Sequence, residues 1–529
     1  MAFHYGTSPA SGSYREILTR LAAFATSKHV SAAAVNNDGS GYTVGDLLTI
    51  SHASDYGDCI IEVLTVGGGG EILTVAIRSA GAFARRLGSA VVNAGGTGYA
   101  VGNILEISGG TATEKAKVRV ATIAGSAVAT VTVFETGGAY SADPTTTGCA
   151  TSNEPGLGTG TGCTLDLTMQ AIIGTTGIAA TGGTGASATF DLTLTATGWT
   201  SLRNRNSFTT NSITDEKEVI LQGTAGGGND PIVGFQTYTQ TSGLDTRYGW
   251  LLVGMDTFNS GLSLASQVGV GPSTTISATG GIVLLMFDDD QDYWFRVNGR
   301  NMVATVKAVG ASTTTYQTGV LGLMSPFGTT SEAPYPMYVS GSTRAANTAP
   351  DAAGFSVSGP TEVFAASASV APAAFRRPSD GAYVAVLNSN NGSVTTVLGV
   401  VLPIGVASEA TGLSTSEDYL ARVGGFGFTG GVSLVSGAVA TVSLMPTIGD
   451  DETELYPATV CSYPNSAADN DSETTVRGEI DGIYWISATK ADGSALVAED
   501  TITVGSTRYK IFQNAHRTER YSYFALAEN

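Results

Sequence analysis

The sequence predicts a mainly β protein, with several small β-sandwich or β-barrel-like domains and one short N-terminal helix. Glycine is very frequent, at 69 of 529 residues, while only 13% of the residues are charged. Apolar residues occur in short or alternating runs bounded by turn residues, which is typical of strands. We expect an N-terminal arm and helix (1–29), tandem small β modules (30–195), a central β-sandwich (196–345) and one or more C-terminal β domains (360–529).

The one amphipathic helix that the sequence predicts covers residues 13–28. Ser13 is a candidate N-cap, and Glu16 three residues later completes a capping-box pattern. The apolar stripe of this helix consists of Tyr14, Ile17, Leu18, Leu21, Ala22 and Phe24. Because a lone helix of this length is marginal in water, we expect the stripe to dock on its own body or on another subunit.

From about Val30 the sequence repeats itself. Residues 39–50, GSGYTVGDLLTI, return as residues 96–107, GTGYAVGNILEI. A strand pair rich in Val and Thr and a Gly-Ala-aromatic turn follow in both copies, and each tyrosine is flanked by glycines that suit a turn with positive φ. Two copies at one spacing predict a small tandem β module, although they indicate no particular chemistry.

The densest apolar patterning lies in residues 281–341. Successive strands are predicted at 282–287, 293–297, 302–307, 320–324 and 333–339, with further strands at 218–222, 232–238 and 248–254. Asn298-Gly299 is predicted to close a two-residue hairpin. Six or more strands joined by short polar turns favour a sandwich.

The C-terminal region follows a polar break at residues 343–359. Strands recur at 383–387 and 394–398, and the chain closes with a strand at 520–526. A terminal strand of this kind is expected to be pinned, either in its own sheet or against a neighbouring molecule.

The formal net charge of −19 disfavours nucleic acid as a partner, because binding to phosphate needs a basic face. No apolar run approaches the length of a membrane span, and no secretory signal peptide is evident. Four cysteines in so long a chain do not form a disulfide framework. Cys149 and Cys163 flank a glycine-rich loop and are a candidate pair, but synthesis in a reducing cytoplasm is the simpler interpretation.

The acidic run from Asp288 to Asp292 is the best candidate for chemistry. Its four carboxylates in five residues are candidate ligands for Ca²⁺, and the simpler interpretation is a solvated turn between two strands. Trp294 beside Asp292 is the place where an exposed aromatic would indicate a sugar-binding platform, whereas burial in a sandwich is the default. A glycosidase would need two carboxylates across a cleft, and no such pair is apparent.

The histidines show neither metal-ligand spacing nor a catalytic motif. They are His4, His29, His52 and His516. We therefore predict no catalytic, cofactor-binding or metal-binding residue, and no enzyme activity.

The repeated Gly-Xaa-Gly-Tyr-Xaa-Val-Gly-Asp/Asn unit resembles small β modules of tailed-bacteriophage virion proteins. Residues 293–300 with Tyr335-Pro336, and residues 481–486 with 509–514, resemble segments of phage structural proteins. The likeness covers roughly half of the chain, in pieces. It implies a structural protein of the tail, the collar or neck, or the baseplate, located in the virion and made in the host cytoplasm.

The function that we expect is mechanical. The protein is expected to form a homo-oligomer, a trimer or hexamer, in which weak contacts multiply, and to contact other tail or neck proteins. The expected interfaces are the apolar stripe of the N-terminal helix and the strand from Tyr521 to Leu526. One alternative is a receptor-binding or glycan-binding fibre that contacts host surface glycan. Another is a tailspike glycan hydrolase.

Overall fold

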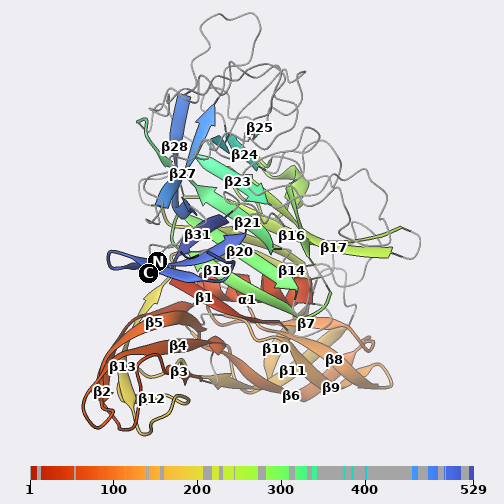
Figure 1. Cartoon of the computed structure of the whole chain (residues 1–529). Coiled ribbons are helices and arrows are strands. Elements are labelled where there is room, and N and C mark those ends of the chain that lie inside the picture. Colours follow the sequence, from red (N-terminus) through yellow and green to blue (C-terminus); the bar gives the residue numbers. More distant parts are fainter. Residues whose placement is uncertain are drawn as a thin grey trace, which may run out of the picture. The chain divides into compact units, whose positions relative to one another are not determined.

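The computed structural model describes residues 2–8, 13–52, 55–112, 115–138, 140, 142–154, 160–206, 217–225, 230–242, 245–271, 282–286, 288–308, 316–329, 336–341, 373–376, 383–386, 400–401, 455–462, 475–486, 494, 496–513 and 523–528. The predicted fold class is confirmed, because the protein is mainly β and α1 (Ser13–Thr26) is the one α-helix among these residues (Figure 1). The chain forms two compact units. Unit 1 comprises Met1–Gly6, Arg15–Gln222 and Val297–Gly299, and unit 2 comprises Thr7–Tyr14, Gly223–Arg296 and Arg300–Asn529.

Most of unit 1 consists of two six-stranded sheets, which we name module A and module B. Module A contains β2 (Lys28–Asn37), β3 (Leu47–Ile50), β4 (Asp55–Val66), β5 (Ile72–Phe83), β12 (Ile178–Ala179) and β13 (Thr189–Ala196). Module B contains β6 (Arg86–Thr97), β7 (Ile104–Ile107), β8 (Lys117–Ala124), β9 (Ala127–Glu135), β10 (Cys149–Asn153) and β11 (Thr161–Gln170). The strand orders are β12-β13-β2-β5-β4-β3 and β6-β11-β10-β7-β8-β9.

The two modules have the same circular order of equivalent strands, and they differ in which pair of neighbouring strands is least completely hydrogen-bonded. In module A, Thr49 of β3 and Thr181 beyond β12 exchange backbone hydrogen bonds of 2.7 and 2.9 Å, which links the two ends. In module B the corresponding strands β7 and β10 pair directly, and the ends meet where Leu87 N donates to Thr136 O at 2.8 Å. Each module is therefore a nearly closed barrel, which leaves few unpaired edges.

The modules are nested in the chain. Strands β2 to β5 of module A are equivalent to β6 to β9 of module B, and β12 and β13 are equivalent to β10 and β11. Module B is continuous in the sequence, whereas module A receives its last two strands only after module B has ended. The sequence repeat at 39–50 and 96–107 is thus only one part of a longer structural repeat, which includes all six strands of each module.

Each module buries its own apolar core. The core of module A consists mainly of Leu48, Ile50, Ile61, Val63, Phe83 and Phe190, and that of module B of Leu105, Ile107, Val118, Leu165 and Cys163. Unit 1 also contains most of β1 (Ala2–Thr7) and the hairpin of β14 (Thr200–Asn206) and β15 (Lys217–Gln222).

Three layers of strands make up unit 2. The first sheet contains β16 (Ile232–Ser242), β17 (Asp245–Met255) and β18 (Ile282–Met286). The second contains β19 (Gln291–Val297), β20 (Asn301–Ala308), β21 (Tyr316–Leu323), β23 (Met337–Gly341), β24 (Ala373–Arg376) and β25 (Tyr383–Val386) in this order. The third contains β26 (Val400–Val401), β27 (Leu455–Ser462), β28 (Thr475–Ile486), β31 (Tyr523–Ala527), β30 (Thr507–Gln513) and β29 (Thr501–Val504) in this order, and β22 (Ser325–Pro326) pairs with β28.

Glycines allow the first two sheets to pack closely. A Cβ atom on Gly319 of β21 would lie 3.1 Å from Leu252 of β17, and one on Gly341 of β23 would lie 3.2 Å from the same side chain. The missing side chains make room for Leu252, so the two sheets pack face to face as in a sandwich.

The structure corrects two of the expected interfaces. The helical residues Ile17, Leu18 and Leu21 are fully buried within the chain, so the apolar stripe of α1 is not available to another subunit. Strand β31 pairs with β28 on one side and with β30 on the other, so its edges are occupied in its own sheet. Residues 521 and 522 of the second expected interface lie outside the described residues.

A smaller correction concerns the turn after β19. Three residues, 298–300, separate β19 from β20, instead of the two that the Asn-Gly pair predicts. The Trp199 indole nitrogen donates to the Asn298 carbonyl, and this contact fixes the wider turn. The strand predicted at 394–398 lies outside the described residues. Among the described residues, no helix combines the length and the apolar character needed to cross a membrane.

Candidate functional site

Asp288, Asp289 and Asp290 of the acidic run lie between β18 and β19, and Gln291 and Asp292 begin β19. Asp289 and Asp290 are exposed, and Asp292 accepts a hydrogen bond of 2.7 Å from the Thr7 hydroxyl. Gln291, between them, is buried and donates its amide to Ser13 at 2.8 Å. In the part of the chain that the structure describes, no three His, Cys, Asp or Glu side chains come close enough together to hold a metal ion.

Trp294 is buried between the second and third sheets of unit 2, with 5% of its surface exposed. Its ring centroid lies 5.1 Å from that of Phe512 and 6.1 Å from that of Tyr316. The Lys307 ammonium lies 5.9 Å from the Trp294 centroid and 5.6 Å from the Tyr316 centroid, within the range of a cation–π contact. The default interpretation of this tryptophan is confirmed, and Trp199 and Trp250 are also buried.

Lys307 connects carboxylates from two sheets. Its ammonium forms an ion pair with Glu499 and lies 3.9 Å from Asp292 Oδ2, while the Tyr316 hydroxyl donates to the same Glu499 oxygen at 2.5 Å. We call Asp292, Trp294, Lys307, Tyr316, Glu499 and Phe512 the Lys307 cluster. The charged members are partly exposed, so their ion pairs are screened by solvent and contribute modestly to stability.

Glu499 adopts a backbone conformation that non-glycine residues rarely use, with φ of +72°. Its N–H donates to Ile511 O at 2.7 Å, and its carbonyl accepts from the Lys510 ammonium, so both backbone groups are fixed by β30. This conformation costs on the order of 1 kcal/mol and directs the Glu499 carboxylate toward Lys307 and Tyr316.

A second polar contact between the same two sheets centres on Arg296, which is fully buried. Its Nη1 donates to Asn301 Oδ1 at 3.1 Å, and its guanidinium lies against Gly482. Burial lowers the pKa of Arg296 to about 10, although the Asp481 carboxylate opposes this effect. Asp481 in turn accepts a hydrogen bond of 2.6 Å from Ser325, so β19, β20, β22 and β28 are joined by polar side chains.

Four buried charged side chains of unit 1, namely Lys117, Glu135, Glu154 and Lys217, contact one another, and we call them the Lys117 cluster. Lys117 Nζ lies 3.1 Å from Glu154 Oε1 and 3.5 Å from Glu135 Oε2, and Lys217 Nζ lies 2.5 Å from Glu135 Oε1. Lys117 also donates to the Asn204 carbonyl at 2.8 Å. The four side chains are at most 6% exposed and join module B to the β14–β15 hairpin.

The sequence analysis did not select the Lys117 cluster. The sequence offered little signal at Lys117, because it lies in a run with Glu114, Lys115 and Arg119 and no local feature marks it as the buried charge. Glu135, directly after the apolar end of its strand, was the clearer signal. Which of these charges meet depends on the strand order and on contacts across module B, and local patterns do not encode that order.

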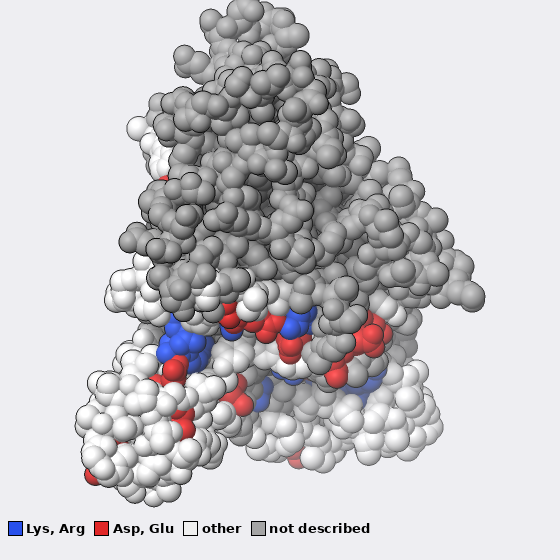
Figure 2. All heavy atoms as spheres, in the orientation of Figure 1, with Lys and Arg blue, Asp and Glu red and all other residues white. Residues whose placement is uncertain are grey.

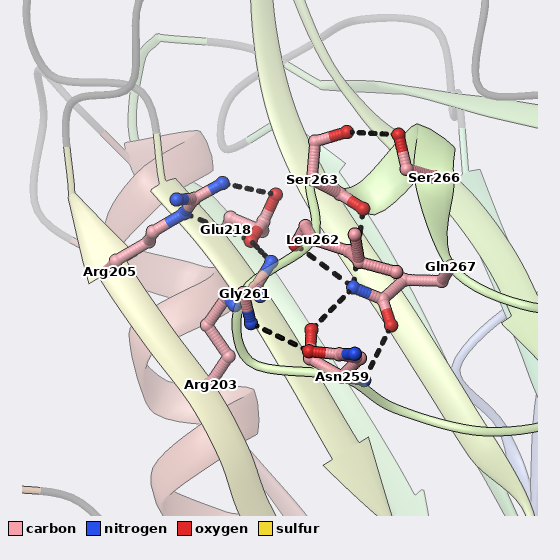
Figure 3. Close-up of polar contacts among 9 residues, drawn as sticks. All are labelled: Arg203, Arg205, Glu218, Asn259, Gly261, Leu262, Ser263, Ser266 and Gln267. Carbon is pink, nitrogen blue, oxygen red and sulfur yellow. Dashed lines mark hydrogen bonds and ion pairs between the residues drawn. The ribbon is translucent and has the colours of Figure 1, made fainter.

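Next along β15, Glu218 is held by two arginines of β14. Figure 3 shows both guanidinium groups directed at its carboxylate, with Arg203 Nη1 at 2.9 Å and Arg205 Nη2 at 3.2 Å. Such charge-assisted contacts fix the hairpin register, in which Arg205 faces Glu218.

In unit 2, the loop after β17 is organised by one side chain, also drawn in Figure 3. The Gln267 amide donates to the carbonyls of Asn259, Leu262 and Ser263 at 2.9, 3.0 and 3.2 Å, and its oxygen accepts from Asn259 N at 2.8 Å. This buried glutamine side chain satisfies backbone groups of the loop that have no partner strand, and it thereby fixes the conformation of the loop.

Cys149 and Cys163 are free thiols, so the candidate disulfide is not formed. Both lie in the core of module B, and burial raises the pKa of each thiol. His4 and His29 are buried as well, and burial lowers their pKa values to about 3 and about 4. His516 lies outside the described residues.

A comparison with models of known protein families finds no match, and a comparison with curated proteins finds no similar sequence.

Proposed function

We propose that the protein is a structural component of a tailed-phage particle, in the tail, the collar or neck, or the baseplate, and that it assembles with copies of itself. The observation that carries this proposal is the duplicated turn. The motif that resembles phage modules forms the same conformation twice. In module A, φ is +58° at Gly39, +79° at Gly41 and +91° at Gly45. In module B, φ is +60° at Gly96, +82° at Gly98 and +91° at Gly102.

Each copy of the turn is fixed by its tyrosine. The Tyr42 hydroxyl accepts a hydrogen bond of 3.2 Å from Ala188 N, and the Tyr99 hydroxyl accepts one of 3.3 Å from the equivalent Cys163 N. These contacts make the turn a rigid projection. A rigid projection loses little conformational entropy when another protein binds it.

At the tip of each turn an apolar side chain faces solvent. Val44 is 63% exposed and Val101, at the equivalent position, is 61% exposed. Figure 2 shows mostly uncharged residues on the modules at the bottom of the view. Two copies of one apolar projection in each chain support assembly through repeated weak contacts.

The charged side chains inside the units support a mechanical role as well. The Lys117 cluster holds a hairpin against module B, and the Lys307 cluster holds the third sheet of unit 2 against the second. The burial of Trp294 leaves the glycan-binding alternative without an exposed aromatic at that residue.

Light scattering over a range of protein concentrations tests the proposal. We expect a discrete oligomer, which the double variant V44D/V101D weakens, because a charge at the contact must be desolvated. The control V504D alters an exposed valine outside the modules and should leave the oligomer unchanged. A wild-type protein that remains monomeric at high concentration contradicts self-assembly, and particles imaged without the labelled chain contradict a virion location.

A further inference from the structure

The Lys117 cluster places an amine between two carboxyl groups where water is excluded. Lys117 Nζ lies 3.1 Å from Glu154 Oε1 and 3.5 Å from Glu135 Oε2, and the side chains of Lys117 and Glu154 are 1% and 3% exposed. The Asn204 carbonyl, 2.8 Å from Nζ, accepts a further hydrogen bond and orients the amine. These contacts hold the amine and the two carboxyl groups side by side, so a reaction between them needs no bimolecular encounter.

The two carboxyl groups have different surroundings. Burial raises the pKa of Glu154, and the neighbouring carboxylates of Glu135 and Glu106 act in the same direction, whereas Lys117 opposes them. Glu135 receives a second ammonium, because Lys217 Nζ lies 2.5 Å from its Oε1. Glu154 is therefore a carboxyl group whose surroundings favour the neutral acid, whereas Glu135 contacts two ammonium groups.

Low polarity also favours the neutral amine. Moving a proton from Lys117 to Glu154 converts a buried ion pair into a neutral amine and a neutral acid, which removes the cost of holding two desolvated charges. A neutral amine is a nucleophile, and a protonated carboxyl group is a better electrophile than a carboxylate. The cluster thus supplies a nucleophile, an electrophile and a base.

We propose that Lys117 and Glu154 condense to form an intramolecular amide bond. Lys117 Nζ forms a bond to Glu154 Cδ, and Glu135 accepts the proton that the nitrogen loses. Glu135 then returns this proton to the departing hydroxyl group, so one water leaves and Glu135 is a carboxylate again. No oxidant, reductant or activating group is consumed, and the lysine and glutamate charges both disappear.

The bond would join two strands of module B that are not neighbours in its sheet. Lys117 begins β8, and Glu154 directly follows β10, while β7 lies between these strands. Glu154 is already held to β7, because its N–H donates to Ile104 O at 3.0 Å. An amide would fasten the end of this barrel covalently and would resist forced separation of the strands.

The test is the intact mass of the wild-type protein, measured after denaturation. We expect the mass to be lower than that of the sequence by one water. Fragmentation of proteolytic peptides should place the bond between Lys117 and Glu154. A wild-type mass equal to that of the sequence, with peptides in which both side chains are unmodified, overturns the proposal without the need for any variant.

Three variants identify the roles. K117R keeps a cation but lacks a nucleophilic amine, so its full mass should be retained. E154Q should lose one ammonia and reach the same final mass as the wild type, because both routes give the same amide. E135Q should accumulate the uncondensed form, since it lacks the base. Retention of the water loss in K117R overturns the assignment to Lys117.

The Lys307–Glu499 pair is an internal control. It is also a lysine–glutamate contact but is partly exposed, and we expect no amide there in the same peptide maps. The result does not depend on the proposed assembly function, because mass and oligomeric state are measured separately.

Discussion

Gly482 packs directly against the guanidinium of Arg296, so closely that a Cβ atom on residue 482 would overlap Nη2. Gly482 also has φ of +73°, a conformation that glycine adopts without strain. Gly482 lies in β28 of the third sheet, at a shift in its register with β27, and this irregularity makes room for the buried guanidinium of the second sheet.

The G482A variant should unfold much more easily than the wild type. Steric overlap with Arg296 and the positive φ together should cost about 2–4 kcal/mol, as an overpacked side chain and a strained backbone each contribute. The control G505A has a similar φ of +64° with nothing within 4 Å of the added Cβ. It should lose only about 1 kcal/mol. Urea unfolding measures both, and equal losses would contradict the role of Arg296.

The Y42F and Y99F variants should have parallel effects in the two modules. Each removes the acceptor of one buried backbone N–H, from Ala188 or from Cys163, at a cost of about 1–3 kcal/mol. Because the two sites lie in separate cores, the double variant should show the sum of the single losses. Unfolding curves that respond to only one of the two substitutions would show that the modules are not equivalent.

Acid should weaken module A through Asp46. Hydrogen bonds from the backbone N–H groups of Thr43 and Thr184, and from their hydroxyls, lower the pKa of this carboxyl from 3.8 to about 2. Since the folded pKa lies below the unfolded value, the stabilisation is complete above pH 3.8 and is lost as the pH falls toward about 2. Thermal unfolding of D46N should be less dependent on pH in this window.

Module B supplies the control for that experiment. Asn103 occupies the equivalent position and accepts from Ala100 N at 2.8 Å without a charge. The N103D variant should gain an acid-sensitive contribution that the wild-type module B lacks. An unchanged pH profile in both variants would rule out the turn carboxylate as the acid-sensitive group.

His4 should make the folded protein sensitive to mild acid. Burial, and secondarily the charge of Arg20, lowers its pKa from 6.5 to about 3. The unfolded chain takes up a proton below pH 6.5 that the folded chain does not. Stability should therefore fall between pH 6.5 and about 3, by up to about 1.4 kcal/mol per pH unit. H4Q should flatten this slope in urea unfolding, and an identical slope would assign it to another group.

The apolar stripe of α1 should behave as core. L21A removes a fully buried side chain and should cost about 2–5 kcal/mol. R20A, on the same helix, removes the partly exposed ion pair with Glu16 at 2.9 Å, and the loss of this pair should cost about 0.3–0.5 kcal/mol. A large effect of R20A on oligomeric state, with L21A folded normally, would restore the helix as an interface.

The sequence predicted the fold class well where local pattern decides the structure. Alternation and glycine turns located β3 to β5, β7 to β9 and β18 to β21, and the capping box located the start of α1. The strands β2 and β6, which precede the repeated turns, were not predicted. The repeat at Tyr42 and Tyr99 predicted two related modules. Their nesting was missed, although residues 164–168 of β11 (TLDLT) and residues 189–193 of β13 (TFDLT) are nearly the same and indicate that these strands are equivalent.

Partners across the fold were harder to predict than strands. Nothing local to Lys307 indicates Glu499, and nothing near Arg296 indicates Gly482, because strands far apart in the sequence bring them together. The helix and the C-terminal strand were assigned to interfaces on the strength of apolar residues. Apolar residues indicate burial, but they do not say whether the covering surface belongs to the same chain.

Because the sequence of module B is inserted into that of module A, the two modules are completed in a fixed order during synthesis. Chains leave the ribosome from the N-terminus, and domains generally fold as they emerge. All strands of module B have been synthesised once the chain reaches Gln170, whereas module A is complete only when the strand that ends at Ala196 has been synthesised. A nascent chain paused directly after Gln170 would contain all six strands of module B and only four of the six strands of module A.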